Sequence, residues 1–589
     1  MKSADILRKT SFFLILAAML LCSITNGAIM WQNCIIPIIL LCIATLLSKS
    51  RSSGIVTDIL IFVSLISCVL SIIFTKSDMQ DGIYESFKYF CFTAAFFSGV
   101  SLGKENFYKL ASILGIVLSI VGILSYCNII RATEYVFNDR GILRLQSLIR
   151  YANTTAVFLA VAYFALGEWK GLNKKLSAFL RMLVLASLYL TVSKAAIPMF
   201  LVFGTFLMIK QQDADFAVFN VVSIAFVLPV ILLARVYMFA PAFLVICVWV
   251  WIGVFLSGKV RYTTKIPAVC ISAYIAAALG AIVLSVFGRF DLLSTFTFRL
   301  KYMEDALSLL PGGVLGNGPG SWQMMQYGVQ QEQYNVTYIH NGWLQFLVEN
   351  GFIFCVAFVG LVSICAYRMF KAKSWSCLVM LVFISAHSFV DIEFGFALTM
   401  IVFGLICGSA SEPSGNVFIP YAVIAMCIVM AGYGCTEYYV RYQFEKAYME
   451  GDYKTALSKA YTLEKICPRD SDLQLNIAQL SGEDTEKRIK TAVSLSPYNS
   501  NHLLRYADFM ISTGRDGVID ILEKVTRMSP KQESIYVEVK QLAQQARIYG
   551  IITESEYLEF IEKTDEFMKS EGVMDRDRML SEFNKRKER

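Results

Sequence analysis

The sequence predicts an all-α protein, a polytopic bundle of transmembrane helices in residues 1–436 followed by a soluble helical domain. Three observations predict this class. Of the 589 residues, 56% are apolar and 17% charged, and the mean hydropathy is +0.55. Soluble domains are about 45–50% apolar and about 25% charged. Long uncharged runs recur through the first part, and the chain becomes polar near Glu437.

The uncharged runs are long enough for pairs of membrane-spanning helices. From Ser11 to Ser48 there is no Asp, Glu, Lys or Arg, and between Phe216 and Ser257 the only charge is Arg235. A bilayer core of about 30 Å needs roughly 20 apolar residues per helix, so about fifteen spans are predicted in the whole chain. They lie at residues 11–30, 34–47, 55–74, 84–101, 107–128, 151–167, 178–192, 195–209, 216–234, 236–256, 266–288, 342–367, 375–391, 394–410 and 417–435.

The cations of the short connections predict the orientation, because cytoplasmic loops carry an excess of Lys and Arg. An N-terminus inside the cell puts basic residues into nearly every inner loop, whereas the outer cations cluster in 131–150 and 289–301. This clustering indicates a site rather than a topology signal. An odd number of spans then places the C-terminus outside, so we expect a multi-pass protein of the cell membrane with an extracytoplasmic C-terminal domain.

The polar tail is predicted to be a helical domain over 437–570, followed by a charged, flexible end at 571–589. Residues 444–468 resemble a tetratricopeptide unit, because small side chains recur where two antiparallel helices would approach closely. Pro497 and Pro530 stand 33 residues apart, near the repeat period of about 34. An unrelated helical hairpin domain is the alternative. With either fold, the domain is predicted to bind a partner rather than to catalyse a reaction.

The longest polar insertion of the membrane part, about 289–341, is predicted to be the extracytoplasmic site loop. Its stretch 312–320 has five glycines in nine residues, including Gly318 and Gly320. Glycine permits backbone turns that other residues resist. No Gly-Lys-Ser/Thr follows, so the run is not a P-loop. An ordinary surface loop is the alternative interpretation.

Histidine is rare, and two of the three histidines, His340 and His387, fall near the outer ends of neighbouring predicted helices. Asp391 lies one turn after His387, on the same predicted helix face. A cap or interface role is the alternative for each histidine. The grouping of both at one membrane surface, with a carboxylate nearby, indicates a site.

Cations gather at the same predicted face, and such residues are functional candidates where they line a cavity. The alternative for some of these cations is that the long side chain only extends its charged end to the membrane surface. Several guanidinium groups directed at one cavity would bind a pyrophosphate through paired hydrogen bonds. The cations of this face are Arg144, Arg150, Lys194, Arg235, Arg299 and Lys301.

Four stretches carry a family resemblance. Arg144 with Tyr151-Ala-Asn153 looks like an Arg…(Tyr/Asn)-Pro-Asn segment, and 191–195 looks like a Ser-Arg-Gly element. The block 299–351 contains the glycine run and His340-Asn341-Gly-Trp, and 387–391 is a further element. Together, over roughly residues 10–435, they resemble the O-antigen ligase and Wzy-type polysaccharide polymerase superfamily.

Two positions depart from the family pattern. Lys194 stands where arginine is usual, and Ala152 replaces a proline. A lysine supplies charge but lacks the fork of a guanidinium.

The resemblance implies a metal-independent glycosyl transfer, without a cofactor, from an undecaprenyl-diphosphate-linked oligosaccharide to an acceptor glycan or surface molecule. His340 would act as general base or orient the acceptor. Arg299, with Arg144 or Arg150, would bind the diphosphate and stabilise the charge that develops on it. The remaining candidates for substrate binding are Lys194, Asn341, Gly318, Gly320, His387 and Asp391.

Other functions stay open at this point. Polymerase and ligase differ only in their acceptor, and the sequence does not separate them. A polysaccharide transporter or flippase, or a non-catalytic receptor with a partner-binding tail, are the alternatives from other classes. The tail domain would bind an acceptor, a growing chain or a protein partner. No block of Lys and Arg indicates nucleic acid, and membrane lipid is the remaining expected partner.

Overall fold

The computed structural model describes residues 2–49, 52–139, 141–268, 270–272, 294–310, 313–411 and 418–573. The protein is 77% helical, which confirms the all-α class. The sheet in the described part is one antiparallel hairpin, β1 (Val136–Asp139) and β2 (Ile142–Leu145).

The centre of the bundle is the helix pair α4 (Met79–Leu102) and α16 (Ala397–Ser409), and every residue of α16 is buried. Glycine brings these helices close together: a Cβ on Gly408 would lie 2.0 Å from the carbonyl oxygen of Phe96. Close approach through small residues is typical of helices that pack within membranes.

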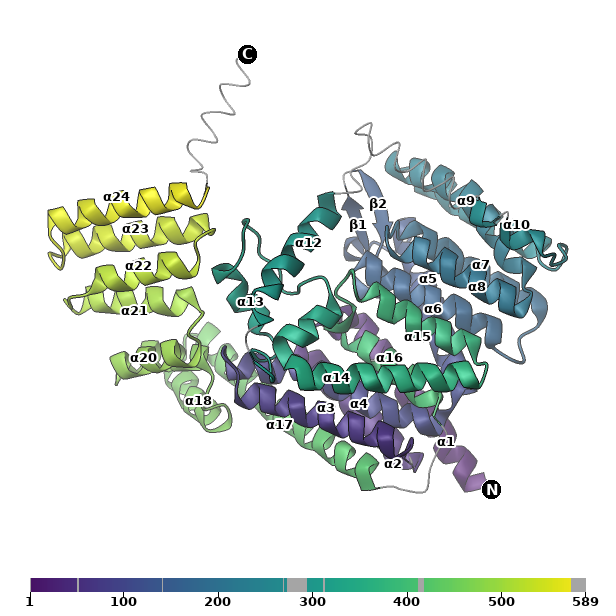
Figure 1. Cartoon of the computed structure of the whole chain (residues 1–589), viewed down its shortest axis with the longest axis horizontal. Coiled ribbons are helices and arrows are strands. Elements are labelled where there is room, and N and C mark those ends of the chain that lie inside the picture. Colours follow the sequence, from purple (N-terminus) through teal and green to yellow (C-terminus); the bar gives the residue numbers. More distant parts are fainter. Residues whose placement is uncertain are drawn as a thin grey trace, which may run out of the picture.

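Helices from both halves of the sequence surround this pair (Figure 1). Their bounds are α1 (Lys2–Ile24), α2 (Ile35–Leu47), α3 (Ile55–Ile73), α5 (Lys104–Tyr126), α6 (Ala152–Glu168), α7 (Lys174–Leu190), α8 (Ala196–Gln211), α9 (Ala214–Arg235), α10 (Phe239–Leu256), α14 (Gly342–Lys371), α15 (Trp375–His387) and α17 (Phe418–Met449). Short 3-10 turns lie at Asn26–Ala28 (η1), Trp31–Cys34 (η2), Thr133–Tyr135 (η3), Ser147–Ile149 (η4), Gln326–Gly328 (η6) and Glu393–Gly395 (η7).

Seven of the described helices are long and apolar enough to cross a membrane: α1, α3, α5, α9, α10, α14 and α17. Several shorter apolar helices lie among them. Every predicted span except 266–288 falls on a helix, and most of 266–288 lies outside the described residues. The count of about fifteen crossings stays a prediction.

The described part of the 289–341 loop is packed rather than extended. It contains α12 (Ser294–Leu307) and α13 (Ser321–Met325). Ala306, Trp322 and Ile339 form a small core with Val348 of α14. Burial of these side chains fixes the loop on the first turns of α14, which is where His340 and Asn341 precede the helix.

The C-terminal domain is a row of consecutive antiparallel helices (Figure 1). Helix α17 runs without a break from the membrane part into this domain, so no linker lies at the predicted boundary near Glu437. The tetratricopeptide assignment stays a prediction, and residues 574–589 of the predicted flexible end lie outside the described part. The remaining helices are α18 (Tyr453–Ile466), α19 (Ser471–Ser481), α20 (Thr485–Leu495), α21 (Ser500–Ser512), α22 (Val518–Met528), α23 (Glu533–Ile548) and α24 (Glu554–Ser570).

Polar contacts attach this domain to the bundle. Asp78, the N-cap of α4, accepts hydrogen bonds from the backbone N–H of Ser471, at 3.1 Å, and from its hydroxyl. The hydroxyl of Tyr84 donates to Glu437 at 2.7 Å. The first pair of contacts holds the beginning of α19 against the beginning of α4, and the second joins α4 to α17.

Candidate functional site

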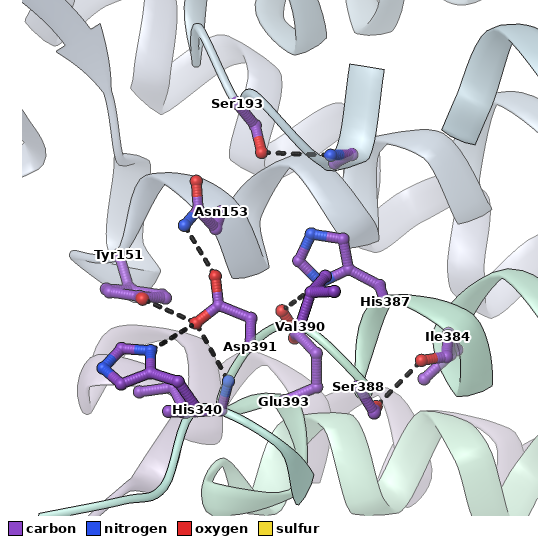
Figure 2. Close-up of polar contacts among 12 residues, drawn as sticks. Tyr151, Asn153, Ser193, His340, Ile384, His387, Ser388, Val390, Asp391 and Glu393 are labelled. Atoms are coloured by element: carbon purple, nitrogen blue, oxygen red, sulfur yellow. Dashed lines mark hydrogen bonds and ion pairs between the residues drawn. The ribbon is translucent and has the colours of Figure 1, made fainter. Parts of the chain in front are cut away.

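The polar centre of the molecule is Asp391, in the turn between α15 and α16 (Figure 2). Its side chain is fully buried. Oδ1 accepts a hydrogen bond from the hydroxyl of Tyr151 at 2.7 Å and lies 3.2 Å from Nδ1 of His340. Oδ2 accepts from Nδ2 of Asn153 at 2.6 Å. Segments 240 and 51 residues away in the sequence therefore meet at one carboxylate.

Arg299, on α12, closes the other side of Asp391. One guanidinium nitrogen lies 3.2 Å from Oδ2, and another donates to the carbonyl of Val390. Burial alone would raise the pKa of Asp391, but the hydrogen bond with His340 and the charge of Arg299 hold this pKa below its ordinary value. The buried carboxylate is therefore ionised at neutral pH.

Arg144 contacts Asp391 indirectly, through Asn153. From β2 it donates to Oδ1 of Asn153 at 2.8 Å and to the carbonyl of Thr191 at 3.0 Å. Asn153 in turn donates to Asp391, so Arg144 fixes the amide orientation that this contact needs. The stretches 144–153 and 191–195 are joined in this way to the turn that carries Asp391.

His340 is held by its backbone as well as its ring. Its φ of +59° is unusual for a residue with a side chain, and such conformations cluster at functional sites. The next residue, Asn341, is the N-cap of α14 and accepts from the N–H of Leu344 at 3.0 Å. The N–H of Gly342 donates to the carbonyl of Ser388 at 2.7 Å. Asn341 therefore has a structural role, and the ring of His340 remains 21% exposed.

Two glycines of the run shape the turns of the loop. Gly318 has a φ of +103°, and a Cβ there would lie 1.9 Å from Oγ1 of Thr75. Its N–H donates to the carbonyl of Glu349 at 2.9 Å. Gly320, with a φ of +75°, precedes α13 next to Glu85 of α4. Both glycines pack against the bundle.

Two further cations were predicted for the site, Arg150 and Lys194. Arg150 is 3.8 Å from the carboxylate of Glu134 and lies over the ring of Tyr135. Lys194 is exposed on the turn that follows α7. The carbonyl of Thr191 in that turn is the group that binds Arg144.

His387 differs from its predicted position on one helix face with Asp391. Helix α15 ends at His387, and the chain turns before Asp391. The buried ring instead has Nδ1 2.9 Å from a carboxylate oxygen of Glu393, without hydrogen-bond geometry. Figure 2 shows this pair next to the Asp391 cluster. Burial raises the pKa of Glu393.

His387, Asp391 and Glu393 place potential ligand atoms within 4.8 Å of one another, which raises the question of a metal ion. Both oxygens of Asp391 are already occupied by donors, one of them the cationic Arg299. A carboxylate offers about four lone-pair sites. The donor set of this cluster therefore does not suit a cation.

A small cavity of about 40 Å³ adjoins His340, between α4 and α14. Nζ of the buried Lys88 donates to Glu85 at 2.6 Å and to the hydroxyl of Tyr338 at 2.5 Å. Glu349 and Gln345 face the same cavity and share a hydrogen bond of 2.6 Å. Carboxylates and amides at this position suit ordered water, for which this volume is sufficient.

Several residues of this centre are absent from the predicted site. Tyr151 and Asn153 stand in a motif that the sequence analysis quotes, but their contact with Asp391 has no local signal. Glu85 and Lys88 did have a local signal in the sequence, because charged residues within an apolar helix are functional candidates by default.

The fold and this centre define a helical bundle with membrane-type helices and a buried, charged hydrogen-bond network at one end. No model of a known protein family matches the chain, and no curated protein sequence matches it.

Proposed function

We propose that the protein transfers a glycan from an undecaprenyl-diphosphate donor to an acceptor on the outer face of the cell membrane, in the manner of O-antigen ligases and Wzy-type polymerases. The observation that supports this most directly is the meeting of the motif stretches around 144–153, 299, 340 and 387–391 at Asp391. Residues that resemble one family's motifs need not converge in space, and here they do.

In this proposal His340 is the general base. With its proton on Nδ1 the ring donates to Asp391, and Nε2 keeps a lone pair for the acceptor hydroxyl. The hydroxyl oxygen attacks the anomeric carbon while its proton passes to Nε2. The bond from that carbon to the diphosphate oxygen breaks, and the lipid diphosphate leaves with the electron pair. Asp391 stabilises the imidazolium that forms, as the carboxylate of a catalytic triad does.

Arg299 would bind the leaving diphosphate. Its contacts to Asp391 and Val390 use part of the guanidinium, which has five N–H donors in all. The side chain is 14% exposed, so its remaining donors have access to a ligand. Donors already oriented before reaction stabilise developing charge most effectively. Arg144 then acts as a positioning residue through Asn153.

The wider arrangement belongs to the same proposal. About fifteen spans would put the N-terminus inside, and the polar centre and the C-terminal domain outside. The tail, as a tetratricopeptide-like module, would bind an acceptor, a growing chain or a protein partner.

The test is reconstitution of the purified protein in liposomes with a lipid-linked oligosaccharide, with product length and transfer as the readout. We expect wild type to give longer or transferred chains and Asp391→Asn to lose on the order of 10²–10⁴-fold in rate, because the imidazole then loses its charged partner. Arg150→Ala is the matched control and should stay active. Equal activity of Asp391→Asn and wild type would contradict the proposal.

A further inference from the structure

A second, larger cavity lies at the opposite end of α7 from the Asp391 centre. Its volume is about 740 Å³, and it opens between the beginnings of α7 and α9 and the end of α10. Helix α7 runs from this cavity to Thr191, which receives the hydrogen bond from Arg144. Its 17 residues span about 25 Å, so the two features belong to different ends of the bundle.

The lining of this cavity carries uncompensated positive charge. Lys174, Lys175 and Lys259 are exposed, and no carboxylate of the described residues lies within ion-pair distance of any of them. The one acidic side chain of the lining, Asp215, accepts hydrogen bonds from the hydroxyl of Ser257 at 2.6 Å and from a backbone N–H at 2.8 Å. These contacts fix the turn that leads to Lys259.

A fourth cation, Arg181, also borders the cavity but is neutralised. Its guanidinium lies 2.6 Å from the carboxylate of Asp213 and over the ring of Tyr163. Arg181 therefore forms part of the wall, and the three lysines supply the available charge.

An exposed apolar stripe on α10 leads into the same cavity. Leu244, Val248, Trp251 and Phe255 recur at helical spacing on one face, and each is about half exposed or more. The rings of Trp251 and Phe255 stack at 5.5 Å between centroids, and Nζ of Lys259 lies 3.1 Å from the centroid of Phe255. Because α10 is long and apolar enough to cross a membrane, this aromatic pair falls at the level of lipid headgroups.

We propose that this cavity binds the headgroup of an anionic phospholipid, with its phosphate at Lys174, Lys175 and Lys259 and an acyl chain along the α10 stripe. Basic pockets between membrane helices suit such headgroups. The predicted orientation puts the cavity in the inner leaflet, where anionic lipid attracts Lys and Arg. A free phosphate would use the lysines but would leave the adjoining apolar stripe without a partner. This site is independent of the proposed glycosyl transfer.

The experiment is native mass spectrometry of the full-length protein in detergent, with phosphatidylglycerol or phosphatidylcholine of identical acyl chains. The variant Lys174→Gln/Lys175→Gln/Lys259→Gln should lose on the order of 10- to 100-fold in phosphatidylglycerol affinity, since each lysine near an anionic surface contributes. The control Lys265→Gln/Lys371→Gln/Lys373→Gln removes the same charge from exposed positions outside the lining and should bind like wild type.

Four results would overturn the proposal: equal retention of both lipids by wild type, unchanged binding in the triple variant, an equal loss in the control, or displacement of the lipid by millimolar inorganic phosphate alone. The last result would identify a simple anion site. If the triple variant does not fold, as judged by its melting temperature, the single variant Lys259→Gln replaces it. That variant should lose roughly fivefold in affinity, and unchanged binding would again overturn the proposal.

Discussion

The side chain of Asp391 shows what single residues do in this protein. A fully buried carboxylate is costly unless donors surround it, and here Tyr151, Asn153, His340 and Arg299 do so. The sequence predicted His340, Arg299, Arg144 and Asp391, because charged and titratable residues at a membrane surface are costly to keep. It could not predict the bridging role of Asn153, which depends on packing between segments 238 residues apart.

The ring of His340 gives the first prediction. His340→Ala should lose roughly 10²–10⁴-fold in transfer rate, the usual range for general acid–base catalysis, while donor binding survives because Arg299 holds the diphosphate. His340→Gln keeps hydrogen-bonding capacity but cannot accept the proton, so it should be nearly as slow. Rates and donor affinity in liposomes measure both effects. Full activity of both variants, at normal protein levels, would remove His340 from the chemistry.

Arg299 gives the second prediction. Arg299→Lys keeps the charge but cannot contact Asp391 and a diphosphate together, so donor binding should weaken by about 1–3 kcal/mol. The measurement is donor titration with the purified variants, with Arg150→Lys as the control at a cation that pairs with Glu134 instead. Unchanged donor affinity in Arg299→Ala would rule out the assigned role.

At the scale of elements, the glycine run shows that a sequence pattern can predict turns without predicting what those turns pack against. The sequence predicted turns in 312–320, and the structure packs Gly318 against Thr75, in the loop that follows α3, and Gly320 against α4. Composition indicates where a chain can turn, whereas the surface against which a turn packs depends on residues such as Thr75, far away in the sequence.

Gly318 gives the third prediction. A methyl group there would collide with Thr75 and sit on a backbone of φ +103°, so Gly318→Ala should destabilise the fold and reduce activity with it. Gly313 is the matched control, because its φ is +110° and a Cβ there meets no atom within 4 Å. We expect Gly318→Ala to cost about 1–3 kcal/mol more than Gly313→Ala. Melting temperatures in detergent compare the two, and equal shifts would contradict the steric argument.

At the scale of the whole molecule, hydropathy predicted the helix ranges well because apolar content is a local property of the chain. The attachment of the tail was not predictable in this way. It depends on Asp78 and Ser471, which are 393 residues apart. The tail also reaches the site loop, since Nε2 of Gln532 lies 3.4 Å from the carbonyl of Tyr334.

The fourth prediction concerns the side of the membrane on which the tail lies. A reporter that is active only outside the cytoplasm, fused after Arg589, should be active, because the predicted number of spans between the two termini is odd. The same reporter fused after Lys373, in a loop predicted to be inside, is the control and should be silent. Activity of a cytoplasm-specific reporter at Arg589 would reject the predicted span count.

The fifth prediction concerns pH at the attachment of the tail. Burial and the nearby carboxylates of Asp78, Asp472, Asp470 and Glu85 raise the pKa of Asp81 to about 7. Because this value is above that of the free side chain, the docked state favours the protonated form, and docking should weaken as the pH rises from about 4 to about 7. After correction for the base-catalysed intrinsic exchange rate, the amides of α19 should therefore be better protected at pH 5 than at pH 8.

Asp81→Asn should remove most of this pH dependence, whereas Asp508→Asn, at an exposed position of α21, should keep it. A dependence of the same size in Asp81→Asn would assign the effect to other groups.

The unbroken course of α17 has a mechanical consequence. Its 32 residues form a rod of about 48 Å, so a change of tilt by about 10° would displace the far end by roughly 8 Å. Helices tilt to match the thickness of the bilayer around them. The tail is also attached to the beginning of α4 through the contact between Asp78 and Ser471. A change in bilayer thickness would therefore strain the contact between Asp78 and Ser471, so the lipid composition of the membrane would affect the position of the tail.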